Sequence, residues 1–87
     1  MTLNFPNQSR FYDATRRGVR FWGHDSAMEV AFFVTEEALR RLQPDVRLDE
    51  TGLLGAFDAN RDLIHAIGSK VYARGRRGHY DLVGADF

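Results

Sequence analysis

Three neighbouring residues, His24, Asp25 and Ser26, are the side-chain types of a hydrolase triad. A triad needs its nucleophile, base and orienting acid to converge in space beside an oxyanion hole, and adjacency in sequence does not provide this. The chain also lacks a Gly-x-Ser-x-Gly nucleophile turn. We therefore interpret the three residues as a polar hairpin loop and assign no catalytic residue. The sequence favours a non-catalytic protein and leaves an enzyme open.

Metal and cofactor chemistry has little support in the sequence. His24, His65 and His79 fall in three different predicted elements, without the helical spacing that would bring two of them to one metal ion. The chain contains no cysteine, so thiolate zinc sites and disulfides are excluded. Residues 75–78 lack the lysine and hydroxyl pair of a phosphate-binding loop and precede a predicted strand. We expect neither a metal nor a cofactor.

Two arginine-rich turns could contact phosphate groups. Arg16 and Arg17 precede one predicted strand, and Arg76 and Arg77 precede another. Such contacts require the two turns to lie at the same edge of the sheet. The formal net charge is zero at pH 7, whereas a dedicated nucleic-acid-binding domain is strongly basic. Nucleic-acid binding is therefore a weaker prediction than protein binding.

The length and composition indicate one ordinary globular domain spanning residues 1–87. The chain is 44% hydrophobic and 28% charged, within the usual range for such domains. It shows neither a secretory signal nor an apolar run near the ~20 residues that cross a membrane. We expect a cytoplasmic protein with no membrane partner.

Alternation of apolar and polar residues predicts the strands. Residues 2–5 read as a short strand, residues 18–23 and 27–34 as a hairpin, and residues 79–83 as a last strand. The apolar faces of the hairpin match only if its loop has an even length. A four-residue loop would pair Phe21 with Val30, and a two-residue loop would pair Arg20 with Glu29 instead. Four side chains then point away from the apolar face: Arg20, Trp22, Glu29 and Phe33.

Two helices are expected between the third and last strands. Thr35 and Asp49 are suitable N-cap residues, and Pro44 follows the end of the first helix. The second helix is predicted from about residue 50 to about residue 74. Asn60 lies at the centre of its apolar stripe. We predict that this amide is buried and either hydrogen-bonds loop or strand backbone near residues 13–17 or lines a small pocket.

These elements predict an α+β fold in the order β-β-β-α-α-β. Burying each apolar side once requires two layers, with a mostly antiparallel sheet of about four strands and both helices on one face.

Three stretches of the sequence resemble members of domain of unknown function family 1488, which are small proteobacterial proteins. The stretches are "YDATRRGVRFWGHDSAMEV", "FDANR" within the second predicted helix, and "YDLVGADF" at the end. The resemblance covers nearly the whole chain and implies a compact two-layer α+β domain. It implies no activity, substrate or catalytic residue.

Function must then come from the side of the sheet that the helices leave uncovered. Arg20, Trp22, Glu29 and Phe33 could form a protein interface or stack single-stranded bases. A terminal segment or the first loop could instead cover them. We expect a non-catalytic protein-interaction module, binding a protein partner or a second copy of itself as a homodimer. A weak single-stranded RNA-binding protein is the alternative.

Overall fold

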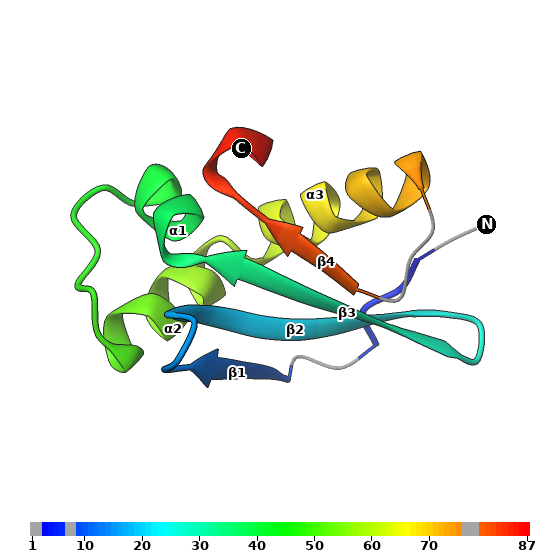
Figure 1. Ribbon diagram of the computed structural model, residues 1–87, viewed down its shortest axis with the longest axis horizontal. Coiled ribbons are helices and arrows are strands. Elements are labelled where there is room, and N and C mark those ends of the chain that lie inside the picture. Colours follow the sequence, from blue (N-terminus) through cyan, green and yellow to red (C-terminus); the bar gives the residue numbers. More distant parts are fainter. Residues whose placement is uncertain (1–2, 7–8, 76–78) are drawn as a thin grey trace.

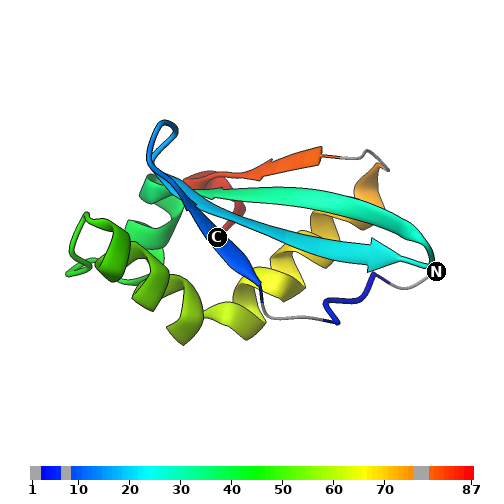
Figure 2. The ribbon, with the colours of Figure 1, turned by 90° about the horizontal axis from the view of Figure 1, so that it is seen from below.

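The structure is a computed structural model that describes residues 3–6, 9–75 and 79–87. Within these residues, a four-stranded mixed sheet carries three α-helices, and all three lie on one side of it (Figures 1 and 2). The α+β class is confirmed, with one helix more than expected. The elements are β1 (Arg10–Asp13), β2 (Gly18–Asp25), β3 (Met28–Thr35), α1 (Glu36–Leu42), α2 (Glu50–Ala59), α3 (Arg61–Arg74), β4 (His79–Leu82) and the 3-10 turn η1 (Gly84–Asp86).

The β2–β3 hairpin turns through two residues, Ser26 and Ala27. Its even length is as predicted and matches the two-residue alternative, but both expected pairings, Phe21 with Val30 and Arg20 with Glu29, are wrong. Phe21 instead lies opposite Phe32. The alternation fixed which faces match and left open a shift by two residues. Both strands continue to the tip because Ser26 adopts a positive φ of 57° there.

The first strand lies later in the chain than expected. β1 spans residues 10–13, whereas residues 3–6 contribute one isolated bridge, between Asn4 and His24. The predicted shared face of Leu3 and Phe5 is nevertheless present, since both pack against the core. Pro6 has no N–H to donate and interrupts pairing along this edge. Two separate segments therefore pair with this edge of β2, namely β1 and the bridge at Asn4.

The last strand, β4, pairs with β3 in parallel, with Phe32 opposite Tyr80. The sheet order is β1-β2-β3-β4, so two pairings are antiparallel and one is parallel. The chain leaves the end of β3, passes through the three helices and returns to the start of β4. A long crossover of this kind joins parallel neighbours. The face pattern of residues 79–83 is the same in either direction, and for this reason the sequence did not reveal the direction.

The predicted single helix over residues 50–74 is divided at Asn60. An unbroken helix would be about 37 Å long, whereas the principal extents of the molecule are 36 × 23 × 22 Å. The division lets both segments pack against the sheet. None of the helices in the described part of the chain is long and apolar enough to cross a membrane.

The predicted burial and hydrogen bonding of Asn60 are wrong. The residue is partly rather than fully buried, and its side-chain amide donates to the carbonyl oxygen of Ala56 at 2.9 Å. Its backbone N–H reaches Ala56 O and Phe57 O, and its own carbonyl accepts from Ile64 N. The residue therefore joins α2 to α3 and does not bind backbone near residues 13–17. The predicted apolar stripe assumes one continuous helix over residues 50–74. The break at Asn60 changes the direction in which every later side chain points.

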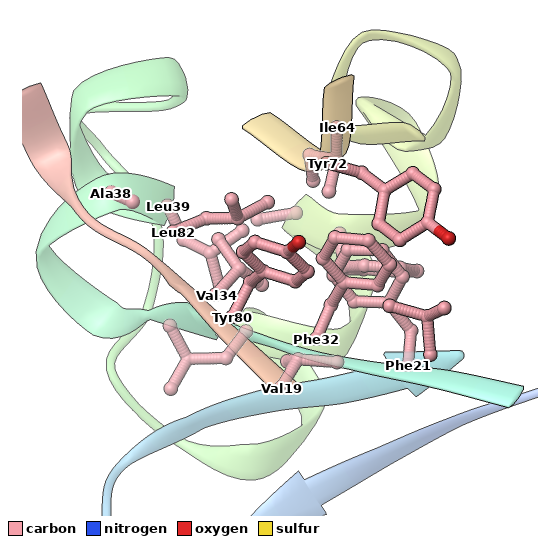
Figure 3. Close-up of a cluster of buried hydrophobic side chains, with 14 residues drawn as sticks. Val19, Phe21, Phe32, Val34, Ala38, Leu39, Ile64, Tyr72, Tyr80 and Leu82 are labelled. Carbon is pink, nitrogen blue, oxygen red and sulfur yellow. The ribbon is translucent and has the colours of Figure 1, made fainter. Parts of the chain in front are cut away.

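The core fills the space between the helices and the facing side of the sheet (Figure 3). Figure 3 shows Phe21 and Phe32 from the strands beneath Ile64 and Tyr72 of α3. The rings of Phe21 and Phe32 stack with centroids 5.1 Å apart. At the hairpin end, the Tyr72 hydroxyl donates to Asp25 Oδ2 at 2.5 Å. The helices therefore occupy one face of the sheet and leave the other to solvent or to a partner.

An ion pair fixes the edge strand β1 to α2. Arg10 donates to both carboxylate oxygens of Asp58, at 2.9 and 2.8 Å. The hydrogen bond from Arg10 lowers the pKa of Asp58 below its usual value. Arg61 adds a second donor to Asp58 at 2.7 Å. This ion pair therefore holds the edge strand β1 against α2.

Candidate interaction face

The surface opposite the helices is termed here the outer face. Side chains alternate between the two sides of each strand, and the strand register places the following residues on this surface: Phe11, Arg20, Trp22, Glu29, Ala31, Phe33, His79 and Asp81. Three of the four residues predicted to form the interaction face, Arg20, Trp22 and Glu29, are at least partly accessible there.

The register arranges the outer face in rows that run across the strands. Arg20 lies between Phe11 of β1 and Phe33 of β3. Trp22 lies opposite Ala31 in the next row, and Glu29 lies one row further, opposite His24. Arg20 and Glu29 are therefore separated by four residues along the strands, or about 13 Å. Trp22 lies midway between the two charges.

Phe33 departs from the prediction that it is exposed. It is only 2% accessible, although it lies on the side without helices. The guanidinium of Arg16 lies over its ring at 4.0 Å from the centroid. Gly18 packs so closely beside it that an added Cβ would collide with the ring. The loop between β1 and β2 thus covers this aromatic, which is one of the alternatives left open by the sequence.

Phe11 is an outer-face aromatic that the sequence interpretation missed. It is 60% exposed, the largest fraction among the exposed large hydrophobic side chains of the described residues. The error followed from placing the first strand at residues 2–5. The alternating "RFYD" at residues 10–13 was the signal that could have located it. The exposed aromatic residue of this face is therefore Phe11 and not Phe33.

Trp22 is partly buried and has a cation beside it. The Arg20 guanidinium lies 5.9 Å from the Trp22 ring, near the limit of a cation–π contact. The two side chains come from the same strand, two residues apart, and share the outer face. The structure thus brings together the aromatic and the cation that both functional alternatives invoked.

The arginines proposed as phosphate contacts are engaged within the chain where they are described. Arg16 pairs with Asp81 at 3.1 Å, and Arg17 pairs with Glu36 at 2.9 Å. Arg76 and Arg77 lie outside the described residues. A phosphate group would have to compete with the carboxylates of Asp81 and Glu36 to bind Arg16 and Arg17.

The triad-like residues do not converge. The prediction that all three lie in the hairpin loop is wrong, because His24 and Asp25 are the last two residues of β2. Since these two are consecutive strand residues, their side chains point to opposite faces of the sheet. Asp25 accepts a hydrogen bond from Tyr72 on the helical side, and Ser26 lies in the turn. Within the described parts of the chain, no three His, Asp or Glu side chains gather closely enough to hold a metal ion.

A family model confirms the resemblance that the sequence suggested. The model for "Protein of unknown function (DUF1488)" matches residues 3–83, which is nearly the whole chain. The chain belongs to the DUF1488 family. The family description supplies no activity, and only the geometry above bears on function.

One solved structure supports the fold of this DUF1488 member. It is the crystal structure of a DUF1488 protein of unknown function from Shewanella loihica PV-4. The two structures agree with a TM-score of 0.80 over 92% of this chain and 90% of the other, at 17% sequence identity. At this identity the likeness shows the fold alone. No curated protein matches the chain.

Proposed function

We propose that this protein is a cytoplasmic, non-catalytic interaction module that self-associates through its outer face. The observation that carries the proposal is a sheet face with no helix over it in the described structure, bearing the exposed Phe11 and the partly buried Trp22. Aromatic side chains that combine apolar area with restricted motion are enriched in protein interfaces.

The arrangement of charge favours a second copy as the partner. A symmetric dimer needs a surface that is complementary to itself. Arg20 and Glu29 lie on either side of the row that contains Trp22. A two-fold axis lying in the interface, across the strands at this row, would bring Arg20 of each copy toward Glu29 of the other. The tryptophans would then meet at the centre.

Neither charge of this pair is neutralised by an ion pair in the part of the chain that the structure describes. Arg20 and Glu29 are both exposed, and neither forms an ion pair with another described residue. An aromatic centre flanked by opposite charges resembles the general anatomy of interfaces, in which a buried anchor is surrounded by polar residues.

Sedimentation across a micromolar concentration series tests the proposal. Trp22→Ala should shift the protein toward monomer. Arg20→Glu and Glu29→Arg should each weaken association, and the double exchange should restore it because the opposite charges face each other again. Leu63→Ala is the matched control, since Leu63 is 46% exposed on α3, on the other side of the molecule. A wild-type monomer at high micromolar concentration, or a mass unaffected by Trp22→Ala, would contradict self-association.

Weak single-stranded RNA binding is the alternative, and the contact between Arg20 and Trp22 is the observation in its favour. A base could stack on the indole while the guanidinium contacts phosphate. Binding to a short oligonucleotide should then weaken steeply as salt rises. Absence of binding at low salt would eliminate this alternative.

A further inference from the structure

A second surface lies between the end of α3 and β4, at the border of the outer face that is farthest from β1. A cavity of about 440 Å³ opens there. Val71, Arg74 and Gly75 line it from the helix end. The remaining wall consists of His79, Tyr80 and Asp81, which are consecutive residues of β4.

The consecutive residues locate the cavity at the edge of the strand. Side chains of successive strand residues point to opposite faces of a sheet. A cavity on one face would therefore contact His79 and Asp81 or else Tyr80. Contact with all three requires a groove that runs along the backbone edge.

This edge of β4 carries no further strand in the described structure. β4 is the last member of the sheet order, and it pairs with β3 on its other side. In Figure 1, α3 lies on the side of β4 that faces away from β3. The groove is thus bounded by a strand edge and a helix, the geometry in which an extended peptide can add to a sheet.

The groove has a positive charge that no ion pair with a described residue balances. Arg74 forms no ion pair with any described residue. The carboxylate of Asp81 is already shared between Arg16 and His79, at 3.1 Å from each. Val71 adds an apolar wall. An incoming segment with a carboxylate opposite Arg74 would match this charge.

We propose that this groove binds an extended, acidic segment of a partner protein, which adds as a strand to β4 and pairs a carboxylate with Arg74. Backbone hydrogen bonds to the strand edge supply a sequence-independent part of the affinity, and Arg74 selects the charge. This inference does not depend on self-association through the outer face, since Arg74 and Val71 lie outside that face, although His79 and Asp81 border both surfaces.

The test uses a short synthetic peptide that alternates valine and threonine around one glutamate. Its binding to the whole protein is measured by fluorescence anisotropy, and its location by amide NMR shifts. Shifts are expected in β4 and residues 71–74. A peptide with lysine in place of glutamate should bind about tenfold more weakly. A third peptide, N-methylated at alternate amides, should lose binding because it cannot pair with a strand.

Variants separate charge recognition from general damage. Arg74→Glu should reverse the preference between the glutamate and lysine peptides, while Arg41→Glu, an exposed arginine of α1, should leave it unchanged. Repeating the titration with Trp22→Ala keeps self-association through the outer face out of the measurement. Equal binding of the N-methylated peptide, shifts confined to β1, β2 and β3, or no binding by any peptide would each overturn the proposal. Self-association abolished by Arg74→Glu but not by Trp22→Ala would also overturn it, because the occupant would be a second copy.

Discussion

The two faces of the sheet have the same alternating construction but differ in what covers them. On the helical side, Phe21 and Phe32 are 1% exposed and lie beneath α2 and α3. On the outer face, Phe11 is 60% exposed, whereas Phe33, two strands away in the same row, is 2% exposed. On the outer face, Arg16 and Gly18 close over Phe33 on an interior strand, whereas Phe11 belongs to the edge strand β1.

This comparison shows that position on a face and burial are separate properties. The helical side is buried by an entire layer, so its aromatic residues contribute to stability through many contacts. The outer face is buried only where Arg16 and Gly18 close over Phe33. The rest of that face retains the apolar surface and charges available for association.

The largest expected effect is the difference in the free energy of unfolding between alanine substitutions on the two faces. Phe32→Ala should cost about 3–5 kcal/mol, because it leaves a cavity among Phe5, Phe21 and Tyr80. Phe11→Ala should change the free energy of unfolding by no more than about 0.5 kcal/mol. Urea unfolding at a protein concentration too low for association provides the measurement. Phe32→Leu serves if the alanine variant does not fold, and equal losses at the two positions would remove the distinction between the faces.

A smaller effect should test how the outer face closes over Phe33. Gly18→Ala should cost about 1–3 kcal/mol, since the new methyl group collides with the Phe33 ring and with the backbone oxygen of Val34. Gly55→Ala is the matched control. No atom lies within 4 Å of a Cβ there, and the change should stabilise α2 by up to about 1 kcal/mol. Thermal unfolding of both variants gives the comparison, and a neutral Gly18→Ala would mean that the Phe33 ring and the neighbouring β3 backbone can shift to accommodate the methyl group.

The smallest effect concerns pH and the helical side. The ring of His65 stacks on Phe5 at 4.0 Å between centroids. Burial, followed by the charge of Arg61, lowers the pKa of His65 below 6.5, while Asp62 opposes this shift. As the pH falls, His65 therefore takes up a proton more readily in the unfolded chain than in the folded protein. The free energy of unfolding should therefore have its full value above pH 6.5 and decrease as the pH falls below it.

His65→Phe should abolish this decline while retaining a ring against Phe5. The measurement is the urea midpoint of both proteins between about pH 5 and pH 8, above the range in which paired carboxylates such as Asp58 are protonated. The same pH slope in the variant and the wild-type protein would assign the decline to another group.

Local features were predictable because their causes lie within a few residues. Thr35 accepts from Ala38 N at 3.1 Å, and Asp49 accepts from Gly52 N at 2.7 Å, as expected for N-caps. The hairpin of β2 and β3 followed from alternation. The break at Asn60 was not predictable in this way, because it depends on the size of the sheet that the helices must cover.

The candidate site was predictable only in part. Alternation correctly grouped Arg20 and Trp22 on one face, and the register keeps them together. The exposed Phe11 escaped because its strand was assigned to the wrong residues. The groove beside β4 also escaped, since it joins residues 71–75 to the strand edge through a parallel pairing that the alternating pattern does not encode.

The sequence by itself determined the faces of the β2–β3 hairpin, the starts of α1 and α2 and the family, because these depend on residue order over short distances or on overall similarity. Only the tertiary structure decided which outer residues are available. Phe33 is covered because Arg16 crosses its ring to reach Asp81, 65 positions later in the chain. No periodicity specifies such a contact, since it exists only after β3 and β4 have come together.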